Sequence, residues 1–292
     1  MNRREKAAWL SVFSNVSLML SKFVVGFSIG SISVISEAIH SANDLLASFI
    51  ALFAVKKSTV PPDEKHPYGH GKIENVSGTL EALLIFIAAA VILNEAIKKI
   101  HQGSEVEALG WGIVVMGFSA LVNIIVSSYL LKVGKEEDSI ALEADGLHLR
   151  TDVYTSLGVF GGLLLIHFTK LNIIDPIAAM LVALLIIKTA YDLTKKAFMP
   201  LVDTALDFNT VATIEGILDE QKNDFIDYYA LRTRKAGRES HIDLHLVVSP
   251  EKNIREVHNI CDKIENKIKN AIPYAYVLIH VEPVSNNSKT LD

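Results

Sequence analysis

Two copies of one short pattern, a histidine followed four residues later by an aspartate, lie in strongly apolar parts of the sequence. They are His40 with Asp44 and His148 with Asp152. Residues four apart share one face of a helix, so two helices would each present an imidazole and a carboxylate to the other. Two imidazoles and two carboxylates complete a tetrahedral site of the kind that Zn²⁺ accepts. The pattern predicts a binding site for a divalent metal ion inside a membrane.

An alternative is that these four side chains serve only the structure, with the aspartates paired to Lys22 or Lys188. Ionisable groups inside a bilayer are costly unless paired and usually mark an ion pathway, and the repetition of the pattern favours the metal site. A metal ligand must be deprotonated and imidazole titrates near pH ~6.5, so metal binding would release protons. The sequence therefore predicts exchange of metal for protons through the same atoms, with the helices opening alternately to the two sides.

Other polar residues in the apolar stretches allow less specific predictions. Asp145 stands three residues before His148 and could orient that ligand or line the entry path. We expect Lys22 to pair with a carboxylate or to extend toward the membrane surface, because a cation beside the site would repel the substrate. Asn123 is typical of hydrogen bonding between helices. For Glu81 the sequence predicts only a polar group of the bundle.

A second group of metal-ligand residues stands in a hydrophilic segment. Asp63, His66 and His70 lie within eight residues of one another. Three such ligands would leave a fourth position to water or to an arriving ion. Pro61 and Pro62 mark the segment as irregular, so composition alone allows a solvated loop without metal equally well.

A third group lies near the C-terminus. The segment His241 to Val248 alternates polar and apolar residues, which places His245 on the polar face of a strand. His280 and Glu282 share a face of a later strand by the same alternation. The alternatives are a metal site on a sheet and a polar outer face without metal.

Composition indicates that membrane-spanning helices carry the two His-x-x-x-Asp pairs. Half of the 292 residues are hydrophobic, and the mean hydropathy is +0.32, which is unusual for a soluble domain of this length. A membrane-spanning helix needs about 20 apolar residues. Six stretches qualify: about Trp9 to Gly30, Val34 to Val55, Ser77 to Ile97, Leu109 to Val133, Ile140 to Phe168 and Ile173 to Phe198.

Basic residues near the ends of these stretches predict the orientation. One side would receive Arg3, Arg4, Lys6, Lys56, Lys57, Lys65, Lys72, Lys132, Lys135, Lys195 and Lys196, and the other Lys98, Lys99 and Lys170. The positive-inside rule then places both termini in the cytoplasm.

The chain after about Pro200 reads as a small soluble domain. Helical spacing covers Asn209 to Gln221 and Ile254 to Ile268, and strand patterns cover Asp227 to Thr233, His241 to Val248 and Tyr276 to Val281. The order αββαβ predicts a sheet with helices on one face. The single cysteine, Cys261, excludes an intrachain disulfide, and a net charge of −5 argues against a nucleic-acid partner.

Together these features resemble the cation diffusion facilitator family. The resemblance rests on the two His-x-x-x-Asp pairs, the loop Asp63-Glu64-Lys65-His66-Pro67-Tyr68-Gly69-His70-Gly71-Lys72, and the αββαβ tail. It implies a homodimeric exporter that moves Zn²⁺, or Fe²⁺, Mn²⁺, Co²⁺ or Cd²⁺, out of the cytoplasm in exchange for protons. Members with an aspartate at the position of His40 handle iron more readily.

The resemblance also implies roles for the hydrophilic residues. Members can bind a second zinc at the positions of Asp63, His66 and His70. In the tail, the positions of His245, His280 and Glu282 bind zinc beside a histidine of the opposite subunit, which His258 matches. A further family ligand is replaced here by Tyr229, which puts a binuclear tail site in doubt. Lys72 and Asp203 match a charge interlock between membrane bundle and tail near the dimer axis.

The resulting prediction is an α-helical membrane protein with six transmembrane helices and a cytoplasmic α+β (αββαβ, metallochaperone-like) domain. Residues 1–200 would form the transport domain, 201–284 the metal-binding and dimerisation domain, and 285–292 a disordered tail. We expect a Zn²⁺/H⁺ antiporter, not an enzyme, in a bacterial or archaeal inner (plasma) membrane, surrounded by lipid. It would need no cofactor, with Zn²⁺ as substrate and regulatory ligand. The alternatives are an Fe²⁺ or Mn²⁺ exporter and a membrane-anchored metal sensor.

Overall fold

The structure is a computed structural model, which describes residues 1–30, 32–102, 111–169 and 173–284. Some side chains within these ranges, including those of residues 36, 37 and 111–116, are also left undescribed. The expected disordered tail, 285–292, lies outside the described residues. The chain forms two compact units, Met1–Met199 and Pro200–Asp292, which we describe separately.

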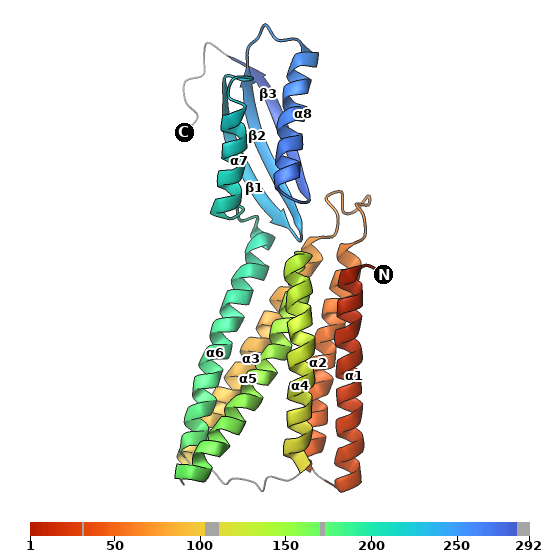
Figure 1. Ribbon diagram of the computed structural model, residues 1–292, viewed down its shortest axis with the longest axis vertical. Helices are drawn as coiled ribbons and strands as arrows, with labels where there is room; N and C mark the ends of the chain where they lie inside the picture. The colour runs from red at the N-terminus through yellow and green to blue at the C-terminus, as the bar shows by residue number, and fades with distance from the viewer. Residues whose placement is uncertain (31, 103–110, 170–172, 285–292) are drawn as a thin grey trace. The chain divides into compact units, whose positions relative to one another are not determined.

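Long helices make up the first unit (Figure 1). They are α1 (Arg3–Ile29), α2 (Ile32–Ser58), α3 (Lys72–Gln102), α4 (Trp111–Glu136), α5 (Ile140–Thr169) and α6 (Ile174–Phe198). Each coincides with one of the predicted apolar stretches, and all but α6 extend beyond it at one or both ends. The extra turns hold charged residues such as Arg4, Glu74 and Lys135, which the hydropathy pattern excludes.

The ends of α1 show how local sequence sets a boundary. The side chain of Asn2 caps the helix by accepting a hydrogen bond of 2.8 Å from the backbone N–H of Glu5. Gly30 ends it with a φ of 65°, a left-handed conformation that glycine adopts without a steric penalty. The helix therefore begins six residues before Trp9, where the apolar stretch starts.

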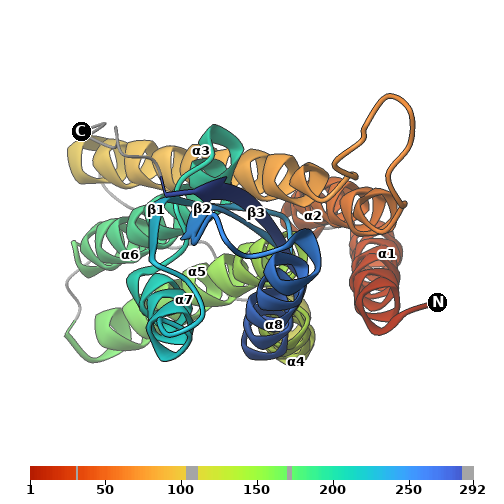
Figure 2. The same cartoon turned by 90° about the horizontal axis from the view of Figure 1, so that it is seen from above.

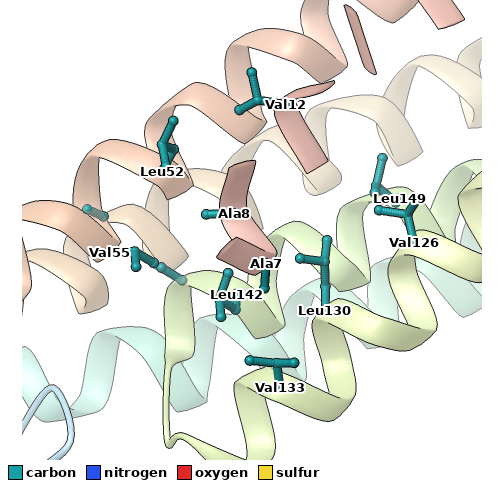
Figure 3. Packing of buried hydrophobic residues seen from close by; sticks show 12 residues of the cluster. Ala7, Ala8, Val12, Leu52, Val55, Val126, Leu130, Val133, Leu142 and Leu149 are labelled. Atoms are coloured by element: carbon teal, nitrogen blue, oxygen red, sulfur yellow. The ribbon is translucent and has the colours of Figure 1, made fainter. Parts of the chain in front are cut away.

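Two apolar cores hold the helices together. The first joins α1, α2, α4 and α5 and includes Ala8, Leu52, Leu130 and Leu149, all buried (Figure 3). The second joins α3, α5 and α6. Helix α5 takes part in both, so its polar residues are held between the two groups of helices.

Five helices of the described chain are long and apolar enough to span a membrane. They are α1, α2, α3, α4 and α6. Helix α5 is 30 residues long, but its first half holds Glu143, Asp145, Arg150 and Asp152. Because five qualifying helices lie beside it, the unit is a helical membrane region, as predicted.

The second unit has the predicted order αββαβ. It consists of α7 (Phe208–Glu220), β1 (Asp227–Ala236), β2 (Glu239–Val248), α8 (Ile254–Ala271) and β3 (Ala275–Pro283). The strands lie in the order β1-β2-β3, with β1 antiparallel and β3 parallel to β2. Both helices cover one face of the sheet (Figure 2), where Ile214, Leu218, Ile264 and Leu244 are buried together. The prediction of a sheet with helices on one face is confirmed.

A bulge in β1 decides which side chains reach the open face. Tyr229 pairs with His245 and Arg232 pairs with Asp243, so β1 has one residue more than β2 between these pairs. Ala230, inside the bulge, has a φ of 52°. Residues paired across two strands share a face of the sheet, so both Tyr229 and Arg232 lie on the open side.

Candidate metal sites

The two His-x-x-x-Asp pairs meet between α2 and α5. Asp44 Oδ1 lies 3.5 Å from His148 Nε2 and 3.9 Å from His40 Nε2. Asp152 Oδ1 lies 3.8 Å from His40 Nε2. The structure thus brings His40, Asp44 and Asp152 into one cluster, and His148 reaches it through Asp44, so each helix supplies two of the predicted ligands.

Most of these ligand side chains are buried, and several of their polar atoms lack a hydrogen-bond partner. The side chains of Asp44, His148 and Asp152 are 7%, 11% and 20% exposed, whereas that of His40 is 54% exposed. Asp44 Oδ1, Asp152 Oδ2 and both ring nitrogens of His148 are buried without a hydrogen-bond partner. Hydrogen bonds of this type measure about 2.7–3.2 Å, less than the distances between these groups. Buried polar atoms are normally satisfied, so this arrangement fits a site for a cation.

A small cavity of about 80 Å³ adjoins these ligands and includes residues to which the sequence assigned other roles. Ser119 and Asn123 of α4 line it, and Ser119 Oγ and Asn123 Oδ1 are buried without a hydrogen-bond partner. Their spacing of four in an apolar helix is the signal that could have identified them. Lys22 of α1 also lines the cavity, where its ammonium donates to Ser41 Oγ at 2.9 Å. A cation therefore does stand at the wall of the site, contrary to expectation.

The loop between α2 and α3 gathers its three predicted ligands. Asp63 Oδ1 lies 3.1 Å from His66 Nδ1, and Asp63 Oδ2 lies 3.3 Å from His70 Nε2. His70 Nδ1 lies 3.3 Å from the carbonyl oxygen of Val60, which can only accept, so this nitrogen is the donor and Nε2 remains a ligand atom. The backbone N–H of His66 donates to Asp63 and lowers the pKa of that carboxyl group. The ring nitrogens of His66 and His70 and the carboxylate of Asp63 are therefore suitable ligands for a metal ion.

The open face of the sheet carries the third cluster. His245 Nδ1 and His280 Nε2 lie 3.1 and 3.4 Å from Glu282 Oε1. The hydroxyl of Tyr229 donates to Glu282 Oε2 at 2.7 Å. Tyr229, followed by His245, lowers the pKa of the Glu282 carboxyl group by donating hydrogen bonds to it. Tyr229, at the position where the family resemblance implies a further ligand, therefore bonds to the carboxylate of the cluster.

His258 does not join this cluster within the described chain. It lies on α8, which covers the other face of the sheet, and its Nε2 is 3.5 Å from Asp262 Oδ2. Its side chain is 70% exposed. The placement is compatible with a histidine presented to another subunit.

The interlock between Lys72 and Asp203 stays a prediction because it would join the two units. Lys72 is the first residue of α3. Within the second unit, Asp203 Oδ1 lies 3.4 Å from Arg234 Nη1.

Comparison with known proteins gives the family. A family model described as the cation efflux transmembrane domain matches residues 8–202, and one described as the cytoplasmic domain of cation efflux proteins matches residues 206–284. Together they cover both units and every candidate ligand.

Similar proteins span nearly the whole chain. An uncharacterized transporter, MJ0449 of Methanocaldococcus jannaschii, is 33% identical over 97% of this chain and 100% of its own length. Manganese efflux system protein MneP of Bacillus subtilis is 30% identical over 95% of both chains. Cation-efflux pump FieF of Shewanella oneidensis is 30% identical over 95% of this chain and 93% of its own length. The predicted resemblance is confirmed: this chain is a multi-pass membrane transporter that belongs to the cation efflux family.

Proposed function

We propose that the protein exports Zn²⁺ from the cytoplasm in exchange for protons, through the site formed by His40, Asp44, His148 and Asp152. The observation that carries this proposal is the group of buried ligand atoms without hydrogen-bond partners on Asp44, His148 and Asp152, between α2 and α5. An unpaired carboxylate in a membrane is costly, and a bound dication would compensate Asp44 and Asp152 together.

The spacing of the ligand atoms supports this choice of ion. Zn²⁺ bonds of about 2.0–2.2 Å set neighbouring ligands of a tetrahedron roughly 3.3–3.6 Å apart. The distances of 3.5, 3.8 and 3.9 Å come within a few tenths of an ångström of that range. Small rotations of the side chains would close the site on the ion.

Imidazole content favours Zn²⁺ over the alternative ions. Nitrogen ligands suit Zn²⁺ and Co²⁺, whereas Mn²⁺ prefers oxygen. The relative named as a manganese efflux protein keeps Mn²⁺ as the second candidate. In this chain Ser119 and Asn123 add oxygen atoms at the cavity wall, which supports that alternative more than the two histidines do.

Proton exchange follows from the same atoms. Zn²⁺ binds only unprotonated imidazole, so protons arriving from the opposite side compete with it for His40 and His148. Alternation of access between the two sides then converts a proton gradient into metal efflux.

The hydrophilic clusters would serve delivery and regulation. We place both termini in the cytoplasm, in an inner membrane, so the loop site of Asp63, His66 and His70 would meet the arriving ion first. The tail would form a homodimer, with His258 of one copy beside His245, His280 and Glu282 of the other. Lys72 and Asp203 would hold the two parts in alignment.

Uptake into inside-out vesicles with a pH gradient tests the proposal. We expect Zn²⁺ uptake that an imposed proton gradient accelerates and a protonophore abolishes. Parallel assays with Fe²⁺, Mn²⁺ and Co²⁺ decide the preferred ion. Metal uptake that is indifferent to the proton gradient would refute the antiport mechanism, and preference for Mn²⁺ would refute the choice of Zn²⁺.

A further inference from the structure

We propose that Ser119 and Asn123 of α4 are specificity residues of the membrane metal site, where their oxygen atoms complete the coordination of ions that take more than four ligands. This inference rests on the transport site proposed above and adds a third helix to it. Four protein ligands satisfy Zn²⁺, whereas Mn²⁺ takes about six oxygen ligands. The two side chains therefore extend the range of accepted ions beyond Zn²⁺.

Both residues are buried and hold oxygen atoms without partners. Ser119 is 6% exposed and Asn123 is 7% exposed. Ser119 Oγ and Asn123 Oδ1 have no hydrogen-bond partner. An unpaired buried oxygen lowers stability, so such atoms are rare in folded proteins and call for an explanation in terms of function.

Neighbouring hydroxyl groups are satisfied by the helix backbone. Ser127 Oγ and Ser128 Oγ, on the same helix, donate to the carbonyl oxygen of Ile124 at 3.2 and 2.6 Å. Such a bond within the helix is the usual way of satisfying a serine in an apolar helix. Because Ser119 Oγ makes no hydrogen bond, its oxygen is left for a group in the cavity.

One cavity of about 80 Å³ joins these oxygens to the metal ligands. Its wall includes Ser119 and Asn123 of α4, His40 and Asp44 of α2, and Asp152 of α5. Residues four apart share one helix face, so the two α4 side chains reach the cavity together. A water molecule needs about 10–15 Å³ of such a cavity, so the space holds an ion with a few water molecules. An ion there can bind to all three helices, directly or through one water.

Neutral oxygen atoms suit the harder ions. The amide of Asn123 and the hydroxyl of Ser119 offer lone pairs but carry no charge. They add ligands without disturbing the balance between a dication and the carboxylates of Asp44 and Asp152. Mn²⁺ gains from the additional ligands, and Zn²⁺, which four ligands already satisfy, gains little.

Lys22 is the other group on the cavity wall that these oxygens could serve. Its ammonium donates to Ser41 Oγ of α2 at 2.9 Å. Ser119 Oγ and Asn123 Oδ1 accept no hydrogen bond from it. The cation of the wall is therefore held by α2, and the α4 oxygens stay available to the transported ion.

The visible absorption of Co²⁺ in the purified, full-length protein tests the coordination number. Tetrahedral Co²⁺ absorbs much more strongly than Co²⁺ with five or six ligands. Subtracting the spectrum of Asp44→Ala isolates the contribution of the membrane site. We expect weak absorption in the parent and strong tetrahedral absorption in the double variant Ser119→Ala, Asn123→Leu, which removes both oxygens.

Uptake of Mn²⁺ and Zn²⁺ into inside-out vesicles tests specificity. The Mn²⁺ concentration at half-maximal uptake should rise by about 10- to 100-fold in the double variant, the usual effect of removing groups that support a metal ion, while that for Zn²⁺ changes by less than about threefold. Ser128→Ala is the matched control, since it removes an exposed serine hydroxyl from the same helix. It should keep the spectrum and the ion profile of the parent.

Thermal unfolding and a second variant separate specificity from a structural role. Replacing unpaired buried oxygens by apolar groups should leave the double variant at least as stable as the parent. Asn123→Asp keeps an oxygen at this position, so its Co²⁺ absorption should stay weak and its preference should move toward Mn²⁺. A shift of Asn123→Asp toward Zn²⁺ would overturn the inference.

Other results would also overturn it. These are tetrahedral Co²⁺ in the parent, no Mn²⁺ uptake by the parent, or equal losses for Mn²⁺ and Zn²⁺ in the double variant, as a packing defect would produce. A parent whose spectrum equals that of Asp44→Ala would refute the four-ligand transport site itself, and this inference with it.

Discussion

The membrane site and the tail site contain similar ligand types but differ in the burial and the hydrogen bonding of those ligands. In the membrane unit, Asp44 Oδ1 and His148 Nε2 face each other at 3.5 Å and neither has a hydrogen-bond partner. In the tail, Glu282 accepts from Tyr229 at 2.7 Å and lies 3.1 Å from His245. One site is buried between helices, and the other lies on an open sheet face.

The difference in burial explains why we assign transport to the membrane site. Buried acceptors without hydrogen-bond partners cost free energy, and a bound cation removes that cost. Their burial therefore raises the affinity of the site for the ion. Exposed ligands can bond to water or to Tyr229, so an ion must displace those partners. We therefore expect the membrane site to determine transport and the tail to modulate it.

The largest expected effect is on transport by Asp44→Ala and Asp152→Ala. Each change removes one of the two carboxylates that balance a bound dication, and an uncompensated buried charge costs about 3–5 kcal/mol. That corresponds to a loss of roughly 100-fold or more in Zn²⁺ affinity. Vesicle uptake should fall to background while the protein remains folded.

Asp192→Ala provides the control, because Asp192 is an exposed carboxylate on α6 of the same unit. It should transport like the parent. Transport by either site variant at the parent rate would show that the four-ligand site is wrong.

A smaller change is expected from His40→Asp, which tests selectivity at the same site. Replacing one nitrogen ligand by oxygen should shift preference from Zn²⁺ toward Mn²⁺ or Fe²⁺. We expect a change of about tenfold in the ratio of uptake rates, equivalent to ~1.4 kcal/mol. An unchanged ion profile in an active variant would place selectivity elsewhere, for example at Ser119 and Asn123.

Metal binding should strengthen dimerisation of the tail, and we expect this effect to be smaller than the two effects on transport. The second unit, Pro200–Asp292, has its own apolar core, so its segment 203–292 can be studied alone. A metal bound between copies favours the dimer, and dimerisation tightens metal binding by the same factor. Sedimentation should show tighter association with Zn²⁺ for the parent and little response for His258→Ala. Equal responses would remove the role between subunits that we assign to His258.

The smallest effect should come from Tyr229→Phe in the same unit. Removing the hydroxyl frees Glu282 Oε2, so Zn²⁺ should bind the tail roughly 3- to 10-fold more tightly near neutral pH, the value of one hydrogen bond. The pKa of Glu282, now lowered by this bond, should rise toward its ordinary value. Zn²⁺ binding should then be lost at a higher pH on acidification. A calorimetric titration at several pH values would measure both, and weaker binding near neutral pH would show that the tyrosine helps to hold the ion.

Much of the fold was predictable because each element has a strong local signal. The apolar stretches marked all six long helices, and alternation marked β2, where every second residue is buried. The sequence did not predict the features that depend on polar residues at helix ends or on irregular backbone conformation. Hydropathy stopped short of the capped start of α1, and the pattern of β1 gave no sign of the bulge at Ala230.

Sequence alone determined the ligand types, their spacing along each helix and the division into an apolar and a hydrophilic part. Periodicity fixes which residues share one helix face, but it does not fix how two helices are rotated and shifted against each other. Close packing at small residues decides that: a Cβ on Gly78 would lie 3.1 Å from the Cβ of Ala197. Only the tertiary structure therefore placed Lys22, Ser119 and Asn123 at the metal cavity.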